Sequence, residues 1–367
     1  MSVTSKIHLL ELTHQQYCQA VQARLGKGFQ HAGLLYEQIL RTGQPDRSIA
    51  AFDNAQALVE AILEMTDLTL LSPAKENSDG TTGKFLLSTP DALEIETVII
   101  PMQAGSTLCV SSQIGCRMGC SFCETGRMGL LRNLSVSEIT SQVFIARHTK
   151  GADIRNVVFM GMGEPFDNYD NVMQAVRVLT DPKGFGFGKR HITVSTSGCS
   201  EAIRRFTDEP GETPNLAVSI SAPINELRNR LMPINRKHDL QELHRDMQAY
   251  NQKTGRQILI AYVLLKEQND TLEHADKLAD YLQGLDVKVN LIPYNPQSRD
   301  RYRPSDPDVL DAFTRRLRER GLYTLLRVTK GKDIMAACGQ LGNIELRKLR
   351  KKTPSFGYNE DRDNAVP

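Results

Sequence analysis

The sequence lacks tryptophan, and aromatic residues make up only 6% of its 367 residues. Any nucleobase that this chain stacks must therefore meet Phe, Tyr or Arg. Long apolar runs are also missing: the longest, Ile258 to Leu265, falls far short of the roughly 18 residues that cross a bilayer, which excludes a membrane span. The opening residues Met1 to Lys6 have no apolar signal-peptide core, so we expect a cytoplasmic protein.

A strong charge of one sign is absent as well. Lys and Arg number 45, Asp and Glu number 43, and the formal net charge is +2. This balance excludes a basic field over the whole chain, so any nucleic-acid contact has to come from local clusters. A solvated helix face is the commoner origin of each such cluster. The clusters are Lys189-Arg190, Arg204-Arg205, Arg315-Arg316 with Arg318 and Arg320, and Arg347-Lys348 with Arg350 to Lys352.

The cysteine count is odd, at seven, so complete disulfide pairing is excluded. Cys116, Cys120 and Cys123 crowd into eight residues with the spacing C-x3-C-x2-C. Three thiolates leave a four-coordinate zinc shell incomplete, although a remote fourth ligand could close it. They suit a 4Fe-4S cluster that keeps one iron open. The spacing therefore favours an iron–sulfur site, with a structural zinc knuckle as the alternative.

Strand-like and helix-like segments alternate from Thr107 onward, which is typical of a parallel sheet with helices outside it. We predict an α/β fold: a partial (βα)6 barrel, because six units are too few to close eight strands. Ser135 and Glu138 form a capping box that opens the first helix, and Tyr323–Val328 is expected as an extra edge strand. The predicted strands are 107–112, 157–160, 192–195, 216–220, 258–264 and 287–292, and the helices are 135–149, 169–180, 199–206, 239–254, 270–283 and 306–320.

The segments on either side of this series have a different character. Residues 1–75 are expected to form a small helical accessory domain. A turn-rich stretch follows at 75–80, and Pro90-Asp91 predicts a hairpin between strands 84–88 and 95–100. The catalytic domain is expected to span 84–342. Residues 343–367 are predicted to be a basic, partly disordered tail.

Polar residues follow several predicted strands at their carboxyl ends, the edge at which such barrels build their sites. They are found in Gly161–Pro165, Ser195–Gly198, Ser219–Ser221 and Asn295-Pro296. The two glycines of the first segment permit close backbone approach to a ligand, and Glu164 can accept a hydrogen bond from an ammonium group. Each segment alone also fits an ordinary turn or helix start. Together they indicate one polar rim.

Longer segments resemble a known enzyme family. The C-x3-C-x2-C spacing after the first strand is the signature of the radical S-adenosylmethionine (SAM) superfamily. The surrounding residues are similar to the RlmN/Cfr family of radical SAM RNA adenine methyltransferases. The resemblance runs in register from about residue 84 to 342. The segments that carry it are Thr107–Cys116, Phe159–Pro165, Leu231–Asn235, Val289–Pro296 and Ala336–Leu341.

The resemblance implies cofactors and partners. A 4Fe-4S cluster on Cys116, Cys120 and Cys123 would bind SAM at its open iron, and an external reductant such as flavodoxin or ferredoxin would supply one electron. The substrate would be ribosomal RNA or transfer RNA, and we expect a monomer. The residues implied to contact SAM are Gly163, Glu164, Ser195, Ser219, Ile220, Ser221 and Asn295.

Catalytic roles are also implied by the resemblance. Cys338 would accept a methyl group from one SAM, and a radical from a second SAM would activate that methyl for addition to an adenine ring carbon. Cys109 would then release the RNA by forming a transient disulfide with Cys338, and Glu96 would accept a proton. A radical route suits this chemistry because the adenine ring carbon is too electron-poor to attack a sulfonium. Cys18 and Cys199 are spare.

One residue departs from the family pattern, and two other functions remain open. The family usually has His where this chain has Ser221, and a hydroxyl is shorter than an imidazole and cannot act as a base near neutral pH. The first alternative is a radical SAM enzyme that acts on a non-RNA substrate, against which the presence of both Cys109 and Cys338 argues. The second is an iron–sulfur or zinc RNA-binding module. The sequence does not distinguish methylation at carbon 2 from carbon 8.

Overall fold

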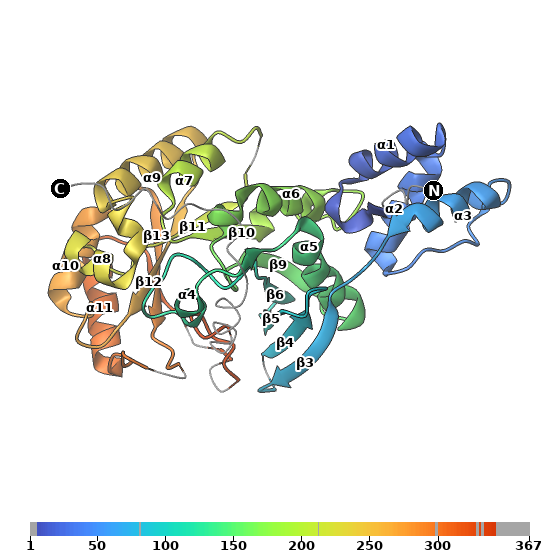
Figure 1. Cartoon of the computed structure of the whole chain (residues 1–367). Coiled ribbons are helices and arrows are strands. Elements are labelled where there is room, and N and C mark those ends of the chain that lie inside the picture. Colours follow the sequence, from blue (N-terminus) through green and yellow to red (C-terminus); the bar gives the residue numbers. More distant parts are fainter. Residues whose placement is uncertain are drawn as a thin grey trace, which may run out of the picture.

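The structure is a computed structural model and describes residues 6–80, 82–211, 213–297, 300–327, 330–331 and 334–342. A curved sheet carries helices along its outer side, and helices α1 to α3 form a separate group at one end of the molecule (Figure 1). Within these residues, no helix combines the length and the apolar character that a membrane crossing requires. The predicted tail at 343–367 lies outside the described residues.

The central sheet has ten strands in the order β14-β13-β12-β11-β10-β9-β6-β5-β4-β3. Its neighbours from β6 to β14 all pair in parallel, so the predicted α/β fold with a parallel series is confirmed. Each strand pairs with the next one of the series, as right-handed βα units require. The parallel strands are β6 (Ser106–Cys109), β9 (Ile154–Phe159), β10 (Ile192–Thr196), β11 (Asn215–Ser219), β12 (Ile258–Leu264), β13 (Val287–Pro293) and β14 (Thr324–Leu326).

Three antiparallel strands extend the sheet beyond β6. The predicted hairpin is confirmed as β4 (Gly83–Ser88) and β5 (Glu94–Pro101). The prediction of a turn-rich stretch from residue 75 was wrong, because β3 (Ser72–Ser78) pairs with β4 there. Nearly all side chains of β3 are exposed, so this edge strand tolerates polar residues that a buried strand would not. Residue 75, the expected end of the accessory domain, lies inside β3.

The helices cover the outer face of the parallel strands, and their starts follow local sequence signals. Ser135 accepts from the backbone of Glu138 while Glu138 accepts from the backbone of Ser135, so the predicted capping box opens α5 (Val136–Phe144). A π-helical turn, Ile145–Thr149, continues it. The other helices of this domain are α4 (Glu124–Met128), α6 (Tyr169–Thr180), α7 (Ser200–Thr207), α8 (Asn225–Leu231), α9 (Leu240–Thr254), α10 (Leu272–Tyr281) and α11 (Pro307–Glu319).

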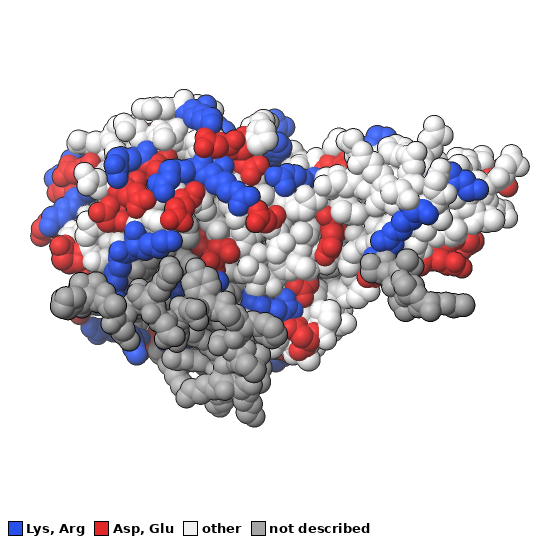
Figure 2. Space-filling view, turned by 45° about the horizontal axis from the view of Figure 1, so that its top comes forward, with Lys and Arg blue, Asp and Glu red and all other residues white. Residues whose placement is uncertain are grey.

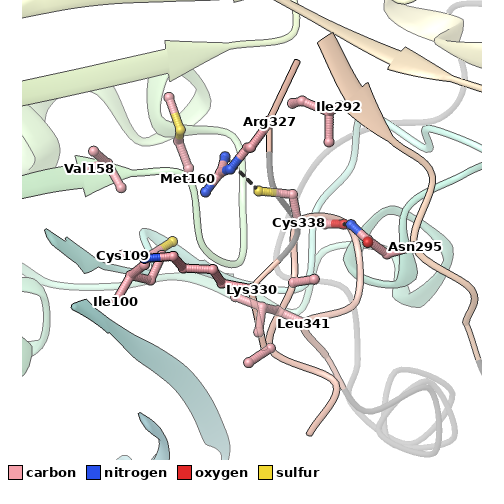
Figure 3. A pocket seen from close by; sticks show the side chains of 12 residues that line it. Ile100, Cys109, Val158, Met160, Ile292, Asn295, Arg327, Lys330, Cys338 and Leu341 are labelled. Carbon is pink, nitrogen blue, oxygen red and sulfur yellow. Dashed lines mark hydrogen bonds between the residues drawn. The ribbon is translucent and has the colours of Figure 1, made fainter. Parts of the chain in front are cut away.

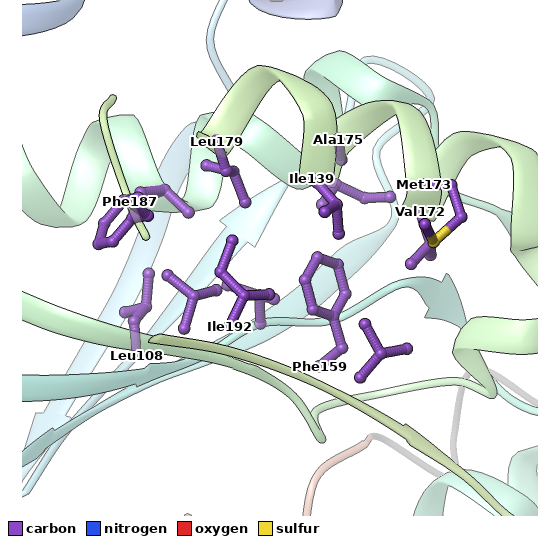
Figure 4. Packing of buried hydrophobic residues seen from close by; sticks show 14 of the residues in the cluster. Leu108, Ile139, Phe159, Val172, Met173, Ala175, Leu179, Phe187 and Ile192 are labelled. Atoms are coloured by element: carbon purple, nitrogen blue, oxygen red, sulfur yellow. The ribbon is translucent and has the colours of Figure 1, made fainter. Parts of the chain in front are cut away.

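The main hydrophobic core lies between the sheet and these helices (Figure 4). Leu108, Phe159 and Ile192 project from three neighbouring strands toward Ile139 of α5 and Leu179 of α6, and all five are almost fully buried. Burying a side chain of this size contributes roughly 1.5–3 kcal/mol. The core therefore fixes the strands firmly, and with them the loops that leave their carboxyl ends.

The N-terminal helices pack on the outer helices of the main domain. Leu9 and Leu10 are fully buried, and Thr140 of α5 donates to the backbone oxygen of Leu10 at 2.8 Å. Gln174 of α6 donates to the backbone oxygen of Glu11 at 2.9 Å. These contacts join the segment to α5 and α6 on the outer side of the sheet. The elements are β1 (Ile7–His8), α1 (His14–Leu25), α2 (Phe29–Thr42), α3 (Gln56–Met65) and β2 (Thr66–Asp67).

A pair of glycines allows the packing after β6 to be tested. Gly115 has a φ of 76°, and a Cβ there would lie 1.8 Å from the backbone oxygen of Gly129. Gly151 has a similar φ of 64°, but nothing lies within 4 Å of its added Cβ. We expect Gly151→Ala to lower the free energy of unfolding by about 1–2 kcal/mol, the cost of a left-handed residue with a side chain. Gly115→Ala should lower it by more than about 4 kcal/mol, because a backbone clash is added.

Urea unfolding followed by circular dichroism measures both values. Equal losses of stability in the two variants would contradict the close packing of residues 115 and 129.

Candidate active site

A pocket with a cavity volume of about 180 Å³ opens at the carboxyl edge of the parallel strands. We call it the cysteine-loop pocket, because Cys116, Cys120 and Cys123 all line it. The structure therefore brings the three cysteines together with most of the strand-end residues that the sequence singled out. Those that line the pocket are Gly163, Glu164, Ser195, Ser219 and Ser221.

Two of the residues implied to contact SAM lie elsewhere. Ile220 is fully buried and does not line the pocket, because side chains alternate along the strand and Ser219 and Ser221 take the open side. Asn295 lines a second, adjoining pocket, and its side-chain amide donates to the backbone oxygen of Cys338 at 3.1 Å.

The loop that carries the three cysteines winds tightly around the start of α4. Gly119 has a φ of 66°, and the backbone N–H of Cys123 donates to the oxygen of Cys120 at 3.2 Å. A Cβ on Gly126 would lie 2.9 Å from the backbone N and O of Cys120, so α4 approaches the loop more closely than any other residue type allows. The sequence analysis did not single out Gly126.

The donor set suits an iron–sulfur cluster. Among the described side chains, no three His, Cys, Asp or Glu converge on a position for a single metal ion. A four-iron cluster instead presents separate irons at its corners, and three thiolates leave one corner open. Burial is the main reason that the pKa of each thiol is raised, to about 12 for Cys120. Iron must therefore displace these protons when it binds.

Glu164 lies deep in the pocket wall and is tightly bonded. One carboxylate oxygen accepts from both the backbone N–H and the hydroxyl of Ser197, each at 2.7 Å. The other accepts from the backbone N–H of Phe166 at 3.1 Å, so Glu164 also caps the short helix that follows it. Burial raises the pKa of Glu164, and the hydrogen bonds from Ser197 and Phe166 oppose that rise.

The glycines before Glu164 are required by the protein's own packing. A Cβ on Gly161 would lie 2.7 Å from the backbone oxygen of Val110, and one on Gly163 would lie 2.6 Å from the side chain of Gln113. The backbone N–H groups of Ser112 and Gln113 both donate to the oxygen of Met162. The sequence analysis interpreted these glycines as space for a ligand; the structure shows that they also let two loops of the chain meet.

Ser195 and Ser221, at the ends of two strands, already make hydrogen bonds within the protein. Ser195 donates from its hydroxyl to the backbone oxygen of Phe159 at 2.6 Å, across neighbouring strands. Ser221, where the family usually has His, has a φ of 48° and accepts from the backbone N–H of Val263 at 3.3 Å. This hydrogen bond connects β12 to the loop after β11.

The second pocket brings together the two remaining cysteines of interest. Cys109, the last residue of β6, and Cys338 both line it, and both are free thiols (Figure 3). Arg327 donates to the sulfur of Cys338 at 3.1 Å. We call this the Cys338 pocket. Arg327, Cys338, Met160 and Ile292 line both pockets, so the two spaces adjoin.

The segment around Cys338 is held directly on the cysteine loop. The backbone N–H of Glu124, one residue after Cys123, donates to the oxygen of Gly339 at 2.8 Å. Gln297 also donates to that oxygen, at 3.0 Å. Residues far apart in the chain are thus joined into one site.

The electrostatics of Cys109 are unfavourable for a thiolate. Burial raises the pKa of its thiol to about 12, and negative charge on Cys338 raises it further, whereas Arg327 lowers it. Cys109 therefore carries its proton near neutral pH in this arrangement. The expected transient disulfide between Cys109 and Cys338 is not formed in this structure, in which both cysteines are free.

Glu96 of β5 does not line either pocket. It is buried, and its carboxylate accepts from the ammonium group of Lys84 at 3.3 Å. Lys84 also donates to the backbone oxygen of Met335 at 3.0 Å, close to Cys338 in the chain. Burial raises the pKa of Glu96, and Lys84 opposes that rise. Because Val98 is the partner of Cys109 across β5 and β6, Glu96 lies one step diagonally from Cys109 on the same side of the sheet.

Most of the basic clusters are paired with acids. Arg205 pairs with Asp170, and Arg316 and Arg320 both pair with Asp276. On the face that Figure 2 shows, Lys and Arg alternate with Asp and Glu. These clusters therefore match the solvated-face interpretation, and the cluster at 347–352 lies outside the described residues.

Two residues of this site were missed from the sequence. Arg327 follows β14 directly, so the strand-end rule that selected Glu164 and Ser195 would also have selected it. Lys84 gave no signal, because a single Lys in a hairpin strand is ordinarily exposed.

The comparisons with known proteins agree with this geometry. The Radical SAM superfamily model matches residues 110–282. A protein of Protochlamydia amoebophila (strain UWE25), named "Probable dual-specificity RNA methyltransferase RlmN 1", is 58% identical over 344 residues, covering 94% of this chain and 96% of the relative. One from Streptococcus gordonii with the name RlmN is 38% identical over 361 residues, covering 95% and 98%.

A solved structure shares the fold over nearly the whole chain. The crystal structure of a radical SAM methyltransferase from Sphaerobacter thermophilus superposes with a TM-score of 0.85 at 39% identity, and the match covers 91% of this chain and 99% of that one. The shared fold thus extends well beyond the parallel strands. With its three-cysteine loop, its strand-end pocket and relatives matched almost end to end, the chain belongs to the RlmN family of radical SAM RNA methyltransferases.

Proposed function

We propose that this enzyme methylates a ring carbon of an adenine in RNA, and that the methyl group passes through Cys338. The observation that carries the proposal is the position of Cys338, which lines both pockets. Its sulfur can thereby face a methyl donor in one pocket and a nucleobase in the other. Because the relatives are named dual-specificity enzymes, we propose both ribosomal and transfer RNA as substrates.

The enzyme uses a 4Fe-4S cluster and SAM, which together supply a 5′-deoxyadenosyl radical when both are bound. We propose Cys116, Cys120 and Cys123 as the cluster ligands. Glu164, Ser195, Ser219 and Ser221 line the same pocket and are proposed to orient SAM, with Gly163 leaving room for it. Asn295 is proposed to act at the boundary of the two pockets, and Ile220 through its backbone.

The remaining roles follow from the Cys338 pocket. Cys338 accepts a methyl group, that methyl loses one hydrogen atom to the 5′-deoxyadenosyl radical, and its carbon bonds to the adenine carbon. The adduct radical would then return one electron to the cluster. Cys109 then attacks the sulfur of Cys338, which releases the methylated RNA and leaves a disulfide. Glu96, diagonal to Cys109 on the neighbouring strand, is proposed to accept the proton that the adenine carbon loses. Arg327 holds the sulfur of Cys338 in place through its hydrogen bond.

Other parts of the chain are proposed to serve the RNA and the electron supply. The helices within residues 1–75 line neither pocket, which supports an RNA-docking role for this segment. An external one-electron reductant such as flavodoxin or ferredoxin is proposed to reduce the cluster. We further propose that the enzyme acts as a monomer in the cytoplasm.

The cluster ligands are testable one at a time. Each of Cys116→Ala, Cys120→Ala and Cys123→Ala should lose the cluster and all SAM cleavage, because two thiolates hold a four-iron cluster poorly. Iron content and 5′-deoxyadenosine formation measure the two losses. Cys18→Ala is the control: this thiol lies between α1 and α2, away from both pockets, so iron content should stay normal. Full iron in any of the three variants would refute the ligand assignment.

The two catalytic cysteines should fail in different ways. Cys338→Ala should never acquire a methyl group and should form no product. Cys109→Ala should still form the methyl thioether and the RNA adduct, but nothing would resolve that adduct. RNA should therefore stay attached to Cys338, visible as a slow-migrating band that ribonuclease trims and as a nucleotide mass on the Cys338 peptide. Wild-type turnover in either variant would show that the two cysteines serve only in packing.

Release of the RNA should depend steeply on pH. The pKa of Cys109 is raised to about 12, so below that value its thiolate fraction rises about tenfold with each pH unit. We expect single-turnover release of RNA from the wild-type adduct, without added thiol, to accelerate by about a hundredfold between pH 7 and pH 9, which is two pH units. A flat profile would show that Cys109 is not the group that attacks.

A further inference from the structure

Arg228 of α8 is a fully buried cation at the carboxyl ends of β10 and β11. Its guanidinium donates to the backbone oxygens of Ser197 at 2.7 Å, Ser219 at 3.1 Å and Ile220 at 3.2 Å. It also donates to the side-chain oxygen of Asn235 at 2.9 Å. All four acceptors are neutral, although the group that they surround carries a full positive charge.

This charge has no acidic partner in the described part of the chain, where every hydrogen bond of Arg228 ends on an amide oxygen. Burial lowers the pKa of Arg228, yet a guanidinium stays protonated in proteins. A buried charge without a counter-charge is strongly unfavourable. The hydrogen bonds explain how the side chain of Arg228 is fixed in place. They do not supply a negative charge that would offset the buried positive charge.

The cysteine-loop pocket lies next to Arg228, because Ser197 and Ser219, whose backbone oxygens accept from its guanidinium, both line that pocket. The helix α8 lies directly against that loop: the backbone N–H of Ser121 donates to the oxygen of Leu231 at 3.0 Å. Leu231 and Met232 pack against Phe122 in one apolar cluster, with Cys120 at its margin. Tyr281 first, and then Cys120 and Cys199, oppose the lowering of the pKa of Arg228 by burial, and Arg228 in turn opposes the rise in the pKa of Cys120. The side chain does not itself line the cysteine-loop pocket, so it acts without touching what binds there.

We propose that Arg228 is the fixed counter-charge of the iron–sulfur cluster and favours its reduced state. The proposal rests on the assignment of Cys116, Cys120 and Cys123 as the cluster ligands. Reduction adds one electron, taken from the external reductant, and so adds one negative charge to a site already bearing three thiolates. A buried positive charge stabilises the reduced form more than the oxidised form, because water does not screen it. Arg228 neither gains nor loses a proton in the step and is a positioning residue.

The test is the midpoint potential of the cluster in anaerobically prepared holoenzyme, followed by electron paramagnetic resonance during a redox titration. Arg228→Gln keeps a polar side chain but removes the charge. At the wild-type midpoint, its ratio of reduced to oxidised cluster should fall at least tenfold, which corresponds to 59 mV for one electron. Arg228→Lys keeps the charge and should stay within about threefold of the wild-type ratio.

A second variant neutralises the charge without removing Arg228. Asn235→Asp places a carboxylate where the amide oxygen now lies, 2.9 Å from the guanidinium. It should lower the reduced fraction in the same direction as Arg228→Gln. Lys237→Gln is the matched control, because Lys237 is an exposed cation of the same segment that pairs with Glu201 at 3.5 Å. Solvent screens that charge, so the potential should not change.

Each outcome decides the question. Wild-type potentials in both Arg228→Gln and Asn235→Asp, with full iron content, would overturn the proposal and leave Arg228 a structural role. Loss of the cluster from Arg228→Gln with retention in Arg228→Lys would support it, and loss from both would favour the hydrogen bonds over the charge. Absence of a cluster from wild-type enzyme would refute the proposed function instead.

Discussion

The contact between the chain after β6 and the chain after β9 sets the geometry of both pockets. Residues 110–113 and 161–163 exchange backbone hydrogen bonds, and neither Gly161 nor Gly163 leaves space for a Cβ. The first segment leads into the cysteine loop, and the second leads into Glu164. Because the two segments are locked to each other, the three thiols and the carboxylate face one space without needing a ligand to draw them together.

In this site, burial affects the charge of the acidic side chains more than ion pairs do. Glu164, the three loop thiols and Cys109 all lie where burial raises the pKa, so burial disfavours negative charge on each of these groups. Arg228 and Arg327 stay charged. The protein thus presents a positively biased interior that suits anionic occupants. Binding of a cluster and the carboxylate of SAM would complete the charge balance that the chain leaves open.

Much of this arrangement could be predicted from the sequence, and the failures have physical causes. The six strands and the cysteine loop were predictable because a buried strand and a metal-ligand spacing are both local patterns. Cys338 could be assigned only through the family resemblance, since a lone cysteine carries no periodic signal. The helix α8 spans seven residues, which is too few for a reliable helical pattern. No sequence pattern therefore indicated where Arg228 lies relative to the cysteine loop. The strand β3 escaped prediction because an exposed edge strand needs no apolar residues.

The bond between Lys84 and the backbone oxygen of Met335 joins residues 251 positions apart. Ribosomes extend a chain by roughly 5–20 residues per second, so the hairpin that carries Lys84 is made well before its partner segment exists. During synthesis the cysteine loop can fold and the parallel strands can assemble while the Cys338 segment is still inside the ribosome. A prematurely terminated chain would therefore contain the cysteine loop and the strand-end residues of its pocket without the Cys338 segment that adjoins them. The site can therefore be completed only late in translation, when the Cys338 segment has been synthesised.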